Sequence, residues 1–319
     1  HEYLVPAAEK RETKPAKVRL ADFSTAPAAH LPEVISGVPR FDRTAKLYIG
    51  GKQARPDSGY SYTVTDHRGV AVGQAGLGNR KDVRNAVEAA NKAGGWASAT
   101  AHNRAQVLYY LAENLEARAA EFRDRIASLV DGNSKAAVAE VAQAVERIAY
   151  YAAWADKYDG LVHGTRSRNV TLAMNEPFGT IAIACPDEAP LLAFVSLVAP
   201  AIAMGNRVVV VPSPVFPLVA TDLYQVLDTS DVPGGVVNIV TGDRTVLAKT
   251  LAEHDDVAAF WYFGVDEGPA AVEAGSIGNL KPVWSHARPV RWADPAEGQG
   301  REFLRRATQV KNIWVPYGE

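Results

Sequence analysis

Cysteine is almost lacking from this sequence of 319 residues, where it occurs once, at Cys185. A single cysteine excludes an intrachain disulfide and a metal cluster built from several thiolates. It also fits a reducing compartment, so we expect a cytoplasmic protein. The seven histidines form no HxxxH or HExxH pair, and we therefore expect no metal site.

An excess of charge of one sign and a long hydrophobic run are lacking as well. The chain has 34 Lys and Arg against 36 Asp and Glu, which leaves no basic face suited to a phosphate backbone, and we expect no nucleic-acid partner. The most apolar segment, residues 189–204, is interrupted by Pro200 and falls short of the ~20 residues that cross a bilayer. We therefore expect no membrane partner. What is present is a hydrophobic content of 47%, enough for a large globular core.

The chain divides into an arm and a folded body. Residues 1–43 are rich in Pro, Ala and charge with little periodicity, which predicts a linker or extended arm. The sequence begins HEYLVP without an initiator methionine, so we expect a piece of a longer protein. Residues 44–300 carry regular patterns and form the predicted domain.

The patterns in this domain predict strands and helices in alternation. A hairpin through Gly50-Gly51 is followed by a strand at 60–66 and by helices over 79–94, 103–130 and 133–160. Short apolar strands then alternate with helices, which is typical of an α/β fold with a doubly wound parallel sheet. We predict these core strands at 180–185, 208–211, 236–240 and 257–262, the intervening helices at 191–204, 217–228 and 245–252, and a further short strand at 280–283.

Several nucleotide-binding and catalytic motifs are lacking. The turn after the first core strand reads CPDEAP, which is not the GxGxxG of a dinucleotide site, and the chain has no P-loop, GxSxG or kinase motif. Motifs alone thus leave the function open within the α/β class.

Three longer stretches carry a resemblance to a known family. EPFGTIAIACP (176–186), APAIAMGNRVVVVP (199–212) and VPGGVVNIVTG (232–242) resemble, in sequence and in order, the cofactor domain of the aldehyde dehydrogenase superfamily. The resemblance extends over residues 46–315. It implies a Rossmann-like doubly wound sheet with a protruding β flap.

The resemblance also implies that the catalytic groups are missing. The family uses a cysteine nucleophile, a glutamate base and an asparagine that holds the oxyanion. The asparagine position is Glu188 here, whose carboxylate would repel an oxyanion. The nucleophile domain that should follow Val283 is absent, and Cys185 ends a buried strand where we expect it to be packed as a small apolar residue. We therefore expect no catalytic residue and no enzyme activity in this chain.

The cofactor positions are degenerate in the same comparison. Val211 and Pro214 occupy the places of a lysine and a glutamate that bind the adenosine ribose in the family. Gly264 and Val265 replace part of the turn that faces the pyrophosphate. We expect no cofactor in this chain and NAD in its parent enzyme, although a helix N-terminus there could still attract an anion.

Two alternating segments have no obvious place in the parallel sheet. Residues 165–176 and 303–319 match the family's flap, whose edge strand pairs with a neighbouring catalytic domain. The alternative is that both segments simply cover the domain's own sheet. The residues predicted to mediate oligomerisation are Val170, Leu172, Val310, Ile313 and Val315.

The most similar subfamily is the tandem aldehyde dehydrogenases of family sixteen, whose second unit lacks the nucleophile domain. The resemblance implies a non-catalytic module that supports dimerisation and completes the active-site region of an upstream NAD-dependent catalytic unit. Its partners would be that unit and a second copy of the chain. Two alternatives remain open: an NAD-linked oxidoreductase using Glu188 or His286, and a nucleotide-binding module.

Overall fold

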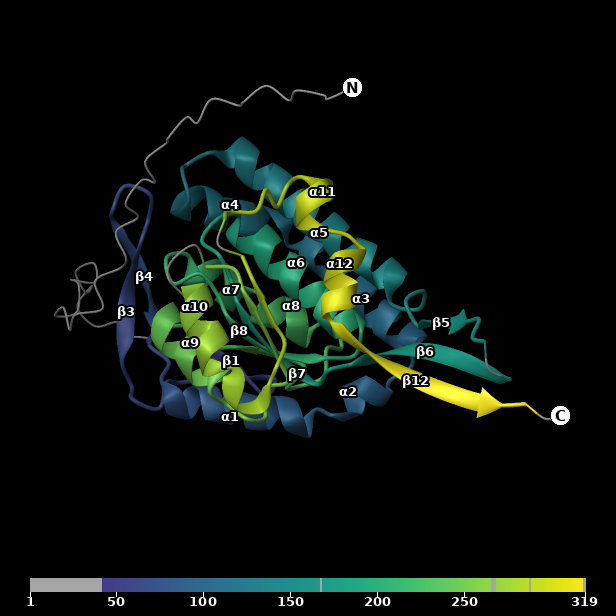
Figure 1. Cartoon of the computed structure of the whole chain (residues 1–319). Helices are drawn as coiled ribbons and strands as arrows, with labels where there is room; N and C mark the ends of the chain where they lie inside the picture. Colours follow the sequence, from purple (N-terminus) through teal and green to yellow (C-terminus); the bar gives the residue numbers. More distant parts are fainter. Residues whose placement is uncertain (1–41, 167, 265–267, 287, 318–319) are drawn as a thin grey trace, which may run out of the picture.

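A seven-stranded sheet forms the centre of the protein in the computed structural model, which describes residues 42–317 apart from 167, 265–267 and 287 (Figure 1). The predicted arm, residues 1–43, thus falls outside the described residues except for its last two. The strand order is β11-β10-β7-β8-β9-β1-β2. The strands are β1 (Leu47–Ile49), β2 (Lys52–Ala54), β7 (Thr180–Ala184), β8 (Arg207–Val211), β9 (Val237–Ile239), β10 (Ala259–Tyr262) and β11 (Val283–Ser285).

The predicted parallel strands lie side by side, and the N-terminal hairpin extends them. Strands β7 to β11 pair in parallel, whereas β1 joins β9 and β2 in antiparallel fashion. The hairpin turn presses on the loop before β9, because a Cβ on Gly51 would lie 2.7 Å from Cα of Gly234. Glycine is therefore required at this contact.

Alternate residues of the core strands face two different helical layers. Ala182, Val209 and Phe260 face one layer, and Ile181, Val208 and Trp261 face the other. The first layer contains α1 (Arg80–Lys92), α9 (Arg244–Ala252) and α10 (Gly268–Gly275). The second is led by α6 (Pro190–Ala203), in which every residue is buried, and this burial explains the most apolar segment of the sequence.

Helices from the N-terminal half cover α6 on its outer side. They are α2 (Gly95–Ser98), α3 (Ala101–Ala117), α4 (Ala119–Leu129) and α5 (Ser134–Trp154), and the same layer contains α7 (Pro217–Asp222), α8 (Tyr224–Asp228) and α12 (Arg301–Arg306). The single helix predicted over 103–130 is wrong in one respect. It is divided at Arg118, where φ is −106°, and its two parts pack separately against α5. The helix predicted over 217–228 is likewise divided, at Leu223.

The strand predicted at 280–283 begins later, at Val283. Leu280 adopts a left-handed conformation with φ of 55°, which an extended strand cannot accommodate. The next residue, Lys281, turns inward, and its Nζ donates to the carbonyl oxygens of Ala252 (2.6 Å) and His254 (2.7 Å) at the end of α9. The chain thus uses 280–281 to cap a helix before it enters the sheet.

The flap forms a separate antiparallel sheet of three strands, in the order β12-β6-β5 (Figure 1). These strands are β5 (Gly160–His163), β6 (Asn169–Pro177) and β12 (Thr308–Pro316). The alternative that both predicted segments cover the domain's own sheet is therefore wrong. Two boundaries differ from the prediction, since β5 joins the flap and residues 303–306 belong to α12, where Phe303 and Leu304 are buried.

Four smaller elements complete the described chain. Strands β3 (Ser61–Thr65) and β4 (Ala71–Gly76) form a two-stranded sheet, of which only β3 is expected from the sequence. A 3-10 turn (Ile277–Asn279) and helix α11 (Pro295–Gly298) lie on either side of β11 in the sequence.

Candidate functional site

The carboxyl ends of β7 and β8 meet where an open α/β sheet usually binds its ligand. Val211 is fully buried there, among the residues that face α1 and α9, and Pro214 is buried as well. The backbone N–H of Cys185 donates to the carbonyl oxygen of Val211 at 2.9 Å. This edge of the sheet, here called the cofactor edge, is therefore apolar at Val211 and Pro214, the two positions singled out from the sequence.

Polar side chains at the same edge are bound to one another. The Ser213 hydroxyl donates to Oδ1 of Asp187 at 2.7 Å, and the Arg244 guanidinium forms an ion pair with the same oxygen. Ser213 also accepts from the backbone N–H of Phe216 at 3.0 Å. Only 5% of the Arg244 side chain is exposed. This Arg244–Asp187–Ser213 cluster ties together the loops that follow β7, β8 and β9.

Glu188 lies beside this cluster in the sequence and has a different environment. Its Oε2 is buried and makes no hydrogen bond within the part of the chain that the structure describes. The N-terminus of α6 is instead bound by Glu140 of α5, whose Oε1 accepts from the N–H groups of Leu191 (2.8 Å) and Leu192 (3.2 Å). Burial raises the pKa of the Glu140 carboxyl. The first two free N–H groups of α6 are thus already satisfied by a side chain.

The end of β10 is closed by aromatic rings. Gly264 packs under Tyr262, where a Cβ would lie 2.7 Å from the phenol oxygen, and Val265 falls outside the described residues. His286 stacks on Phe263 with ring centroids 4.8 Å apart, and Trp284 meets Phe263 edge to face. Burial, and secondarily Arg306, lowers the pKa of His286. This histidine is part of a packed aromatic cluster.

A buried arginine fixes the segment that follows β11. Arg147 of α5 donates to the Ser196 hydroxyl (2.5 Å), to the carbonyl oxygen of Trp292 (3.0 Å) and to that of Gly298. These bonds hold the segment around Trp292 against α5 and α6. The aromatic cluster at the end of β10 is therefore covered by the chain itself.

The flap exposes apolar residues on both of its faces. The pairing of Ile313 with Leu172, and of Leu172 with Val162, places these three in one row on one face. Val170 and Val315 form the next row on that face. The other face carries Leu161, Val310 and Trp314, and Trp314 is 63% exposed. Val310 therefore lies opposite to the other four residues predicted for oligomerisation.

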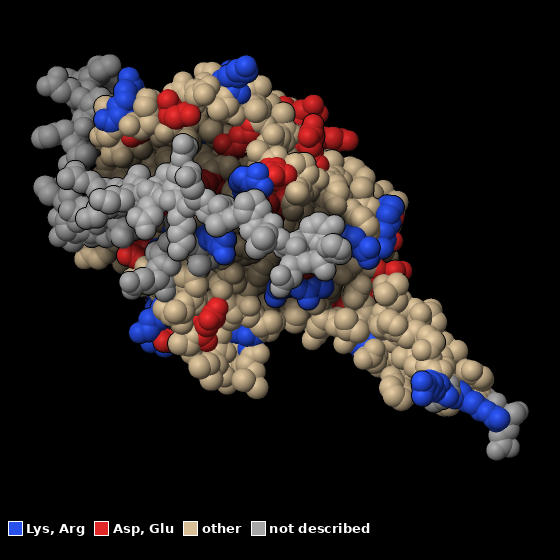
Figure 2. All heavy atoms as spheres, turned by 45° about the horizontal axis from the view of Figure 1, so that its top comes forward, with Lys and Arg blue, Asp and Glu red and all other residues tan. Residues whose placement is uncertain are grey.

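Charge is sparse on this projecting sheet. Figure 2 shows the flap as an arm that is mostly uncharged on the visible face, with basic residues towards its tip. Lys311 on β12 pairs with Glu176 on β6 at 3.1 Å, and this pair lies towards the body. The stretch of the flap between this pair and the tip thus presents a mostly apolar surface.

Comparisons with known proteins agree with this architecture. A sequence profile described as "Aldehyde dehydrogenase family" matches residues 54–284. The chain belongs to the aldehyde dehydrogenase family. Human cytosolic 10-formyltetrahydrofolate dehydrogenase is 30% identical over 252 residues, which cover 75% of this chain and 28% of that protein. Mitochondrial benzaldehyde dehydrogenase of Antirrhinum majus is 31% identical over 271 residues, covering 82% of this chain and 50% of the relative.

Solved aldehyde dehydrogenase structures share the fold over the same extent. The NAD+ complex of an aldehyde dehydrogenase from Bacillus cereus superposes with a TM-score of 0.73 at 23% identity, covering 76% of this chain and 50% of that one. HpcC from Thermus thermophilus gives a TM-score of 0.72 at 29% identity, covering 76% of this chain and 48% of that one. The chain thus spans half the length, or less, of the relatives it matches, as the prediction of a missing nucleophile domain requires.

The cofactor edge of this aldehyde dehydrogenase family member lacks the side chains that the resemblance assigns to dinucleotide binding. Val211 and Pro214 supply no side-chain donor or acceptor for a ribose, and the loop after β7 presents the carboxylates Asp187 and Glu188. Arg244 offsets the charge of Asp187, so the carboxylate of Glu188, unpartnered at Oε2 among the described residues, is the group here that would repel a phosphate. The described residues of this edge therefore do not fit a dinucleotide.

Sequence reasoning missed the residues that fill this edge. Ser213 lies between Val211 and Pro214, and Arg244 directly follows the N-cap Asp243 of α9, so both were visible at strand ends. What could not be seen was their meeting at Asp187. Elsewhere, no group of three or more His, Cys, Asp or Glu residues in the described ranges could hold a metal ion. None of the helices described here has the length and apolar character needed to cross a membrane.

Proposed function

We propose that this chain is a non-catalytic aldehyde-dehydrogenase-like module that associates, through its flap, with a second copy of itself and with a catalytic aldehyde dehydrogenase unit. The observation that carries the proposal is the exposure of apolar residues on both faces of the flap. Small antiparallel sheets need cover to be stable in water, and an exposed apolar patch with an open strand edge marks an association site. The catalytic partner would complete its active-site region with this flap.

The partner is proposed to precede this module in one longer chain. The family match and the share of each relative that is covered support this view, because relatives of about twice the length share only this half. The coding sequence upstream of His1 tests it directly. A catalytic aldehyde dehydrogenase unit in the same reading frame is expected, and a start codon immediately before His1 contradicts it.

Association through the flap is tested by two matched double variants. Ile313→Glu with Trp314→Glu adds one charge to each face at an apolar position, and Gln309→Glu with Asn312→Glu adds one to each face at a polar position. We expect the wild type and the polar-position variant to be dimeric by light scattering and the apolar-position variant to be monomeric. Circular dichroism should show all three to be folded.

Either of two results would remove this function. A wild-type chain that is monomeric at micromolar concentration would contradict dimerisation, and equal disruption by both variants would show that added charge, and not the apolar surface, is responsible.

We also propose a cytoplasmic location, which the single cysteine supports. The names of the relatives include both a cytosolic and a mitochondrial protein.

A nucleotide-binding role is the second candidate, favoured by one observation. The sheet keeps the topology of structures described as NAD+ complexes. In the proposed module the parent enzyme uses NAD and this domain binds none, because Arg244, Asp187 and Ser213 are engaged with one another at the edge of the sheet. Calorimetric titration of the chain with NAD+ separates the two: micromolar affinity supports the nucleotide-binding module, and absence of heat supports the present proposal.

A further inference from the structure

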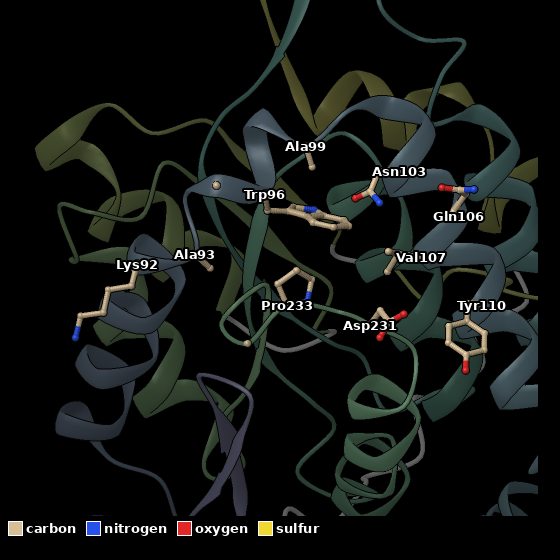
Figure 3. Close-up of a pocket in the computed structure, with 12 residues that line it drawn as sticks. Lys92, Ala93, Trp96, Ala99, Asn103, Gln106, Val107, Tyr110, Asp231 and Pro233 are labelled. Carbon is tan, nitrogen blue, oxygen red and sulfur yellow. The ribbon is translucent and has the colours of Figure 1, made fainter.

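A cavity of about 620 Å³ opens near the amino ends of the core strands, on the side opposite to the cofactor edge (Figure 3). It lies between the end of α1, helix α2, the first turns of α3 and the loop that precedes β9. Its size falls in the range of small-molecule sites. None of its lining residues belongs to the flap or to the cofactor edge.

One face of α3 supplies the polar wall of this cavity. Asn103, Gln106 and Tyr110 line it together with Val107, a spacing that places all four on one side of the helix. The side chains of Asn103, Gln106 and Tyr110 have no hydrogen bond to another described residue. Their polar groups are therefore available to a ligand.

The opposite wall carries a carboxylate, Asp231, on a loop whose backbone is anchored. Asp231 has a left-handed backbone with φ of 58°, a conformation that costs a non-glycine residue free energy and that aspartate tolerates better than most. Asn114 of α3 donates to the Thr229 carbonyl oxygen and to the Ser230 hydroxyl, both at 2.9 Å, which anchors the loop just before Asp231. Just after it, Gly235 packs on α1, where a Cβ would lie 2.5 Å from the Ala89 carbonyl oxygen.

Aromatic rings and charge define what this cavity can hold. Trp96 lines the cavity and is fixed by a hydrogen bond from Nε1 to the carbonyl oxygen of Ile202 at 2.9 Å. Figure 3 shows Asp231 on the same side of the cavity as Tyr110, whereas the Lys92 side chain is turned away from both. A carboxylate beside an aromatic ring, with amide groups nearby, is complementary to a positive charge on an organic group.

We infer that this cavity is a binding site for a small organic cation that bears an ammonium group. The ammonium lies beside Asp231 and the Tyr110 ring, and the polar body of the ligand bonds to the amides of Asn103 and Gln106. The loop and α3 are held together before the ligand arrives, so binding requires little reorganisation. The inference is independent of assembly through the flap.

The test uses two cations and a neutral counterpart on the whole chain. Choline and ethanolamine are the probes, and 3,3-dimethylbutan-1-ol has the shape of choline without its charge. We expect calorimetry to detect the cations at millimolar concentration and not the alcohol. Asp231→Asn retains a residue suited to the left-handed conformation, and it should weaken binding about tenfold or more by removing the charge.

The control removes a carboxylate from an exposed position on α3, the helix that lines the cavity. Glu116→Gln should leave cation binding unchanged, because Glu116 does not line the cavity. The inference is overturned if neither cation binds, if the neutral alcohol binds as well as choline, or if Glu116→Gln and Asp231→Asn weaken binding equally. Melting temperatures of the variants distinguish lost binding from lost folding.

Discussion

Cys185 shows how the position of a residue removes its chemistry. Its thiol is at the end of β7 and fully enclosed, and burial raises its pKa to about 12. Only the thiolate attacks electrophiles, so this raised pKa leaves very little of the reactive form at pH 8. The sequence correctly indicated a packed cysteine, since an apolar strand leads into it.

The first prediction concerns labelling of this thiol. Iodoacetamide at pH 8 should modify Cys185 very slowly in the folded chain and rapidly in urea, because unfolding exposes the sulfur and restores its ordinary pKa. Mass spectrometry of the intact chain measures the modified fraction over time. Rapid labelling of the folded chain would mean that the sulfur is accessible, contrary to its burial beneath α6 and the loops of the carboxyl edge.

A second prediction at the residue scale concerns the cofactor edge. Val211→Lys with Pro214→Glu restores the two side chains that the family uses for the ribose, yet Arg244, Asp187 and Ser213 still occupy the neighbouring positions. We therefore expect the double variant to bind NAD+ no better than the wild type in calorimetry. A clear gain in affinity would show that the two positions alone account for the lost site.

The sequence could single out Val211, Pro214, Gly264 and Glu188 as counterparts of the family's site residues, because matching a motif requires only order along the chain. It could not reveal the cluster that fills the edge, because Asp187, Ser213 and Arg244 follow three different strands. Their contact depends on the parallel packing of those strands. Likewise, nothing local indicates that Glu140, 51 residues before Leu191, binds the start of α6.

At the scale of elements, Lys281 explains why the last core strand starts where it does. Its ammonium group donates to the carbonyl oxygens of Leu251, Ala252 and His254 at the end of α9. The Leu251 and His254 oxygens also accept from backbone N–H groups, at 3.3 and 3.2 Å, so Lys281 adds a further donor to the end of the helix. The cap therefore couples the end of α9 to the start of β11.

The third prediction follows from this cap. Lys281→Met should lower the free energy of unfolding by about 1–3 kcal/mol, because its ammonium group no longer donates to the carbonyl oxygens at the end of α9. Lys249→Met is the matched control, since Lys249 lies on the same helix with an exposed side chain and should change stability by less than about 0.5 kcal/mol. Urea unfolding followed by circular dichroism measures both. Equal stability of the two variants would contradict the role of the cap.

The hydrophobic periodicity of the sequence predicted most helices and strands well. It failed where a single residue breaks a helix. Helix 103–130 keeps one apolar stripe, so the break at Arg118 leaves no mark in the periodicity. The flap strands were recognised from their alternation, but their faces were not. Only the register, with Ile313 opposite Leu172 and Val310 opposite Asn175, assigns Val310 to the second face.

At the scale of the whole molecule, the chain holds one half of an aldehyde dehydrogenase fold. It covers 50% of the Bacillus cereus enzyme, and the segment after β11 is held by Arg147 against α5 and α6. The aromatic cluster around Phe263 and His286 is covered by this segment. The segment after β11 thus closes the surface of the domain at the end of β10.

The fourth prediction is that this chain alone does not oxidise aldehydes. Purified protein with NAD+ and a simple aldehyde should produce no NADH above background, because its single thiol is enclosed and its oxyanion position carries the carboxylate of Glu188. Absorbance at the NADH band measures this, with a catalytic aldehyde dehydrogenase as the positive control. Turnover that survives Cys185→Ala but not Glu188→Gln or His286→Ala would instead support an altered oxidoreductase.

The sequence by itself determined the family and the positions of most core strands along the chain. Each of these depends on residue type and on spacing along the chain. Only the tertiary structure decided that Arg244, Asp187 and Ser213 fill the cofactor edge, that the flap is a separate sheet with two apolar faces, and that a cavity forms beside Asp231. These features arise where distant segments meet, and such contacts follow from packing and register, which a local pattern does not contain.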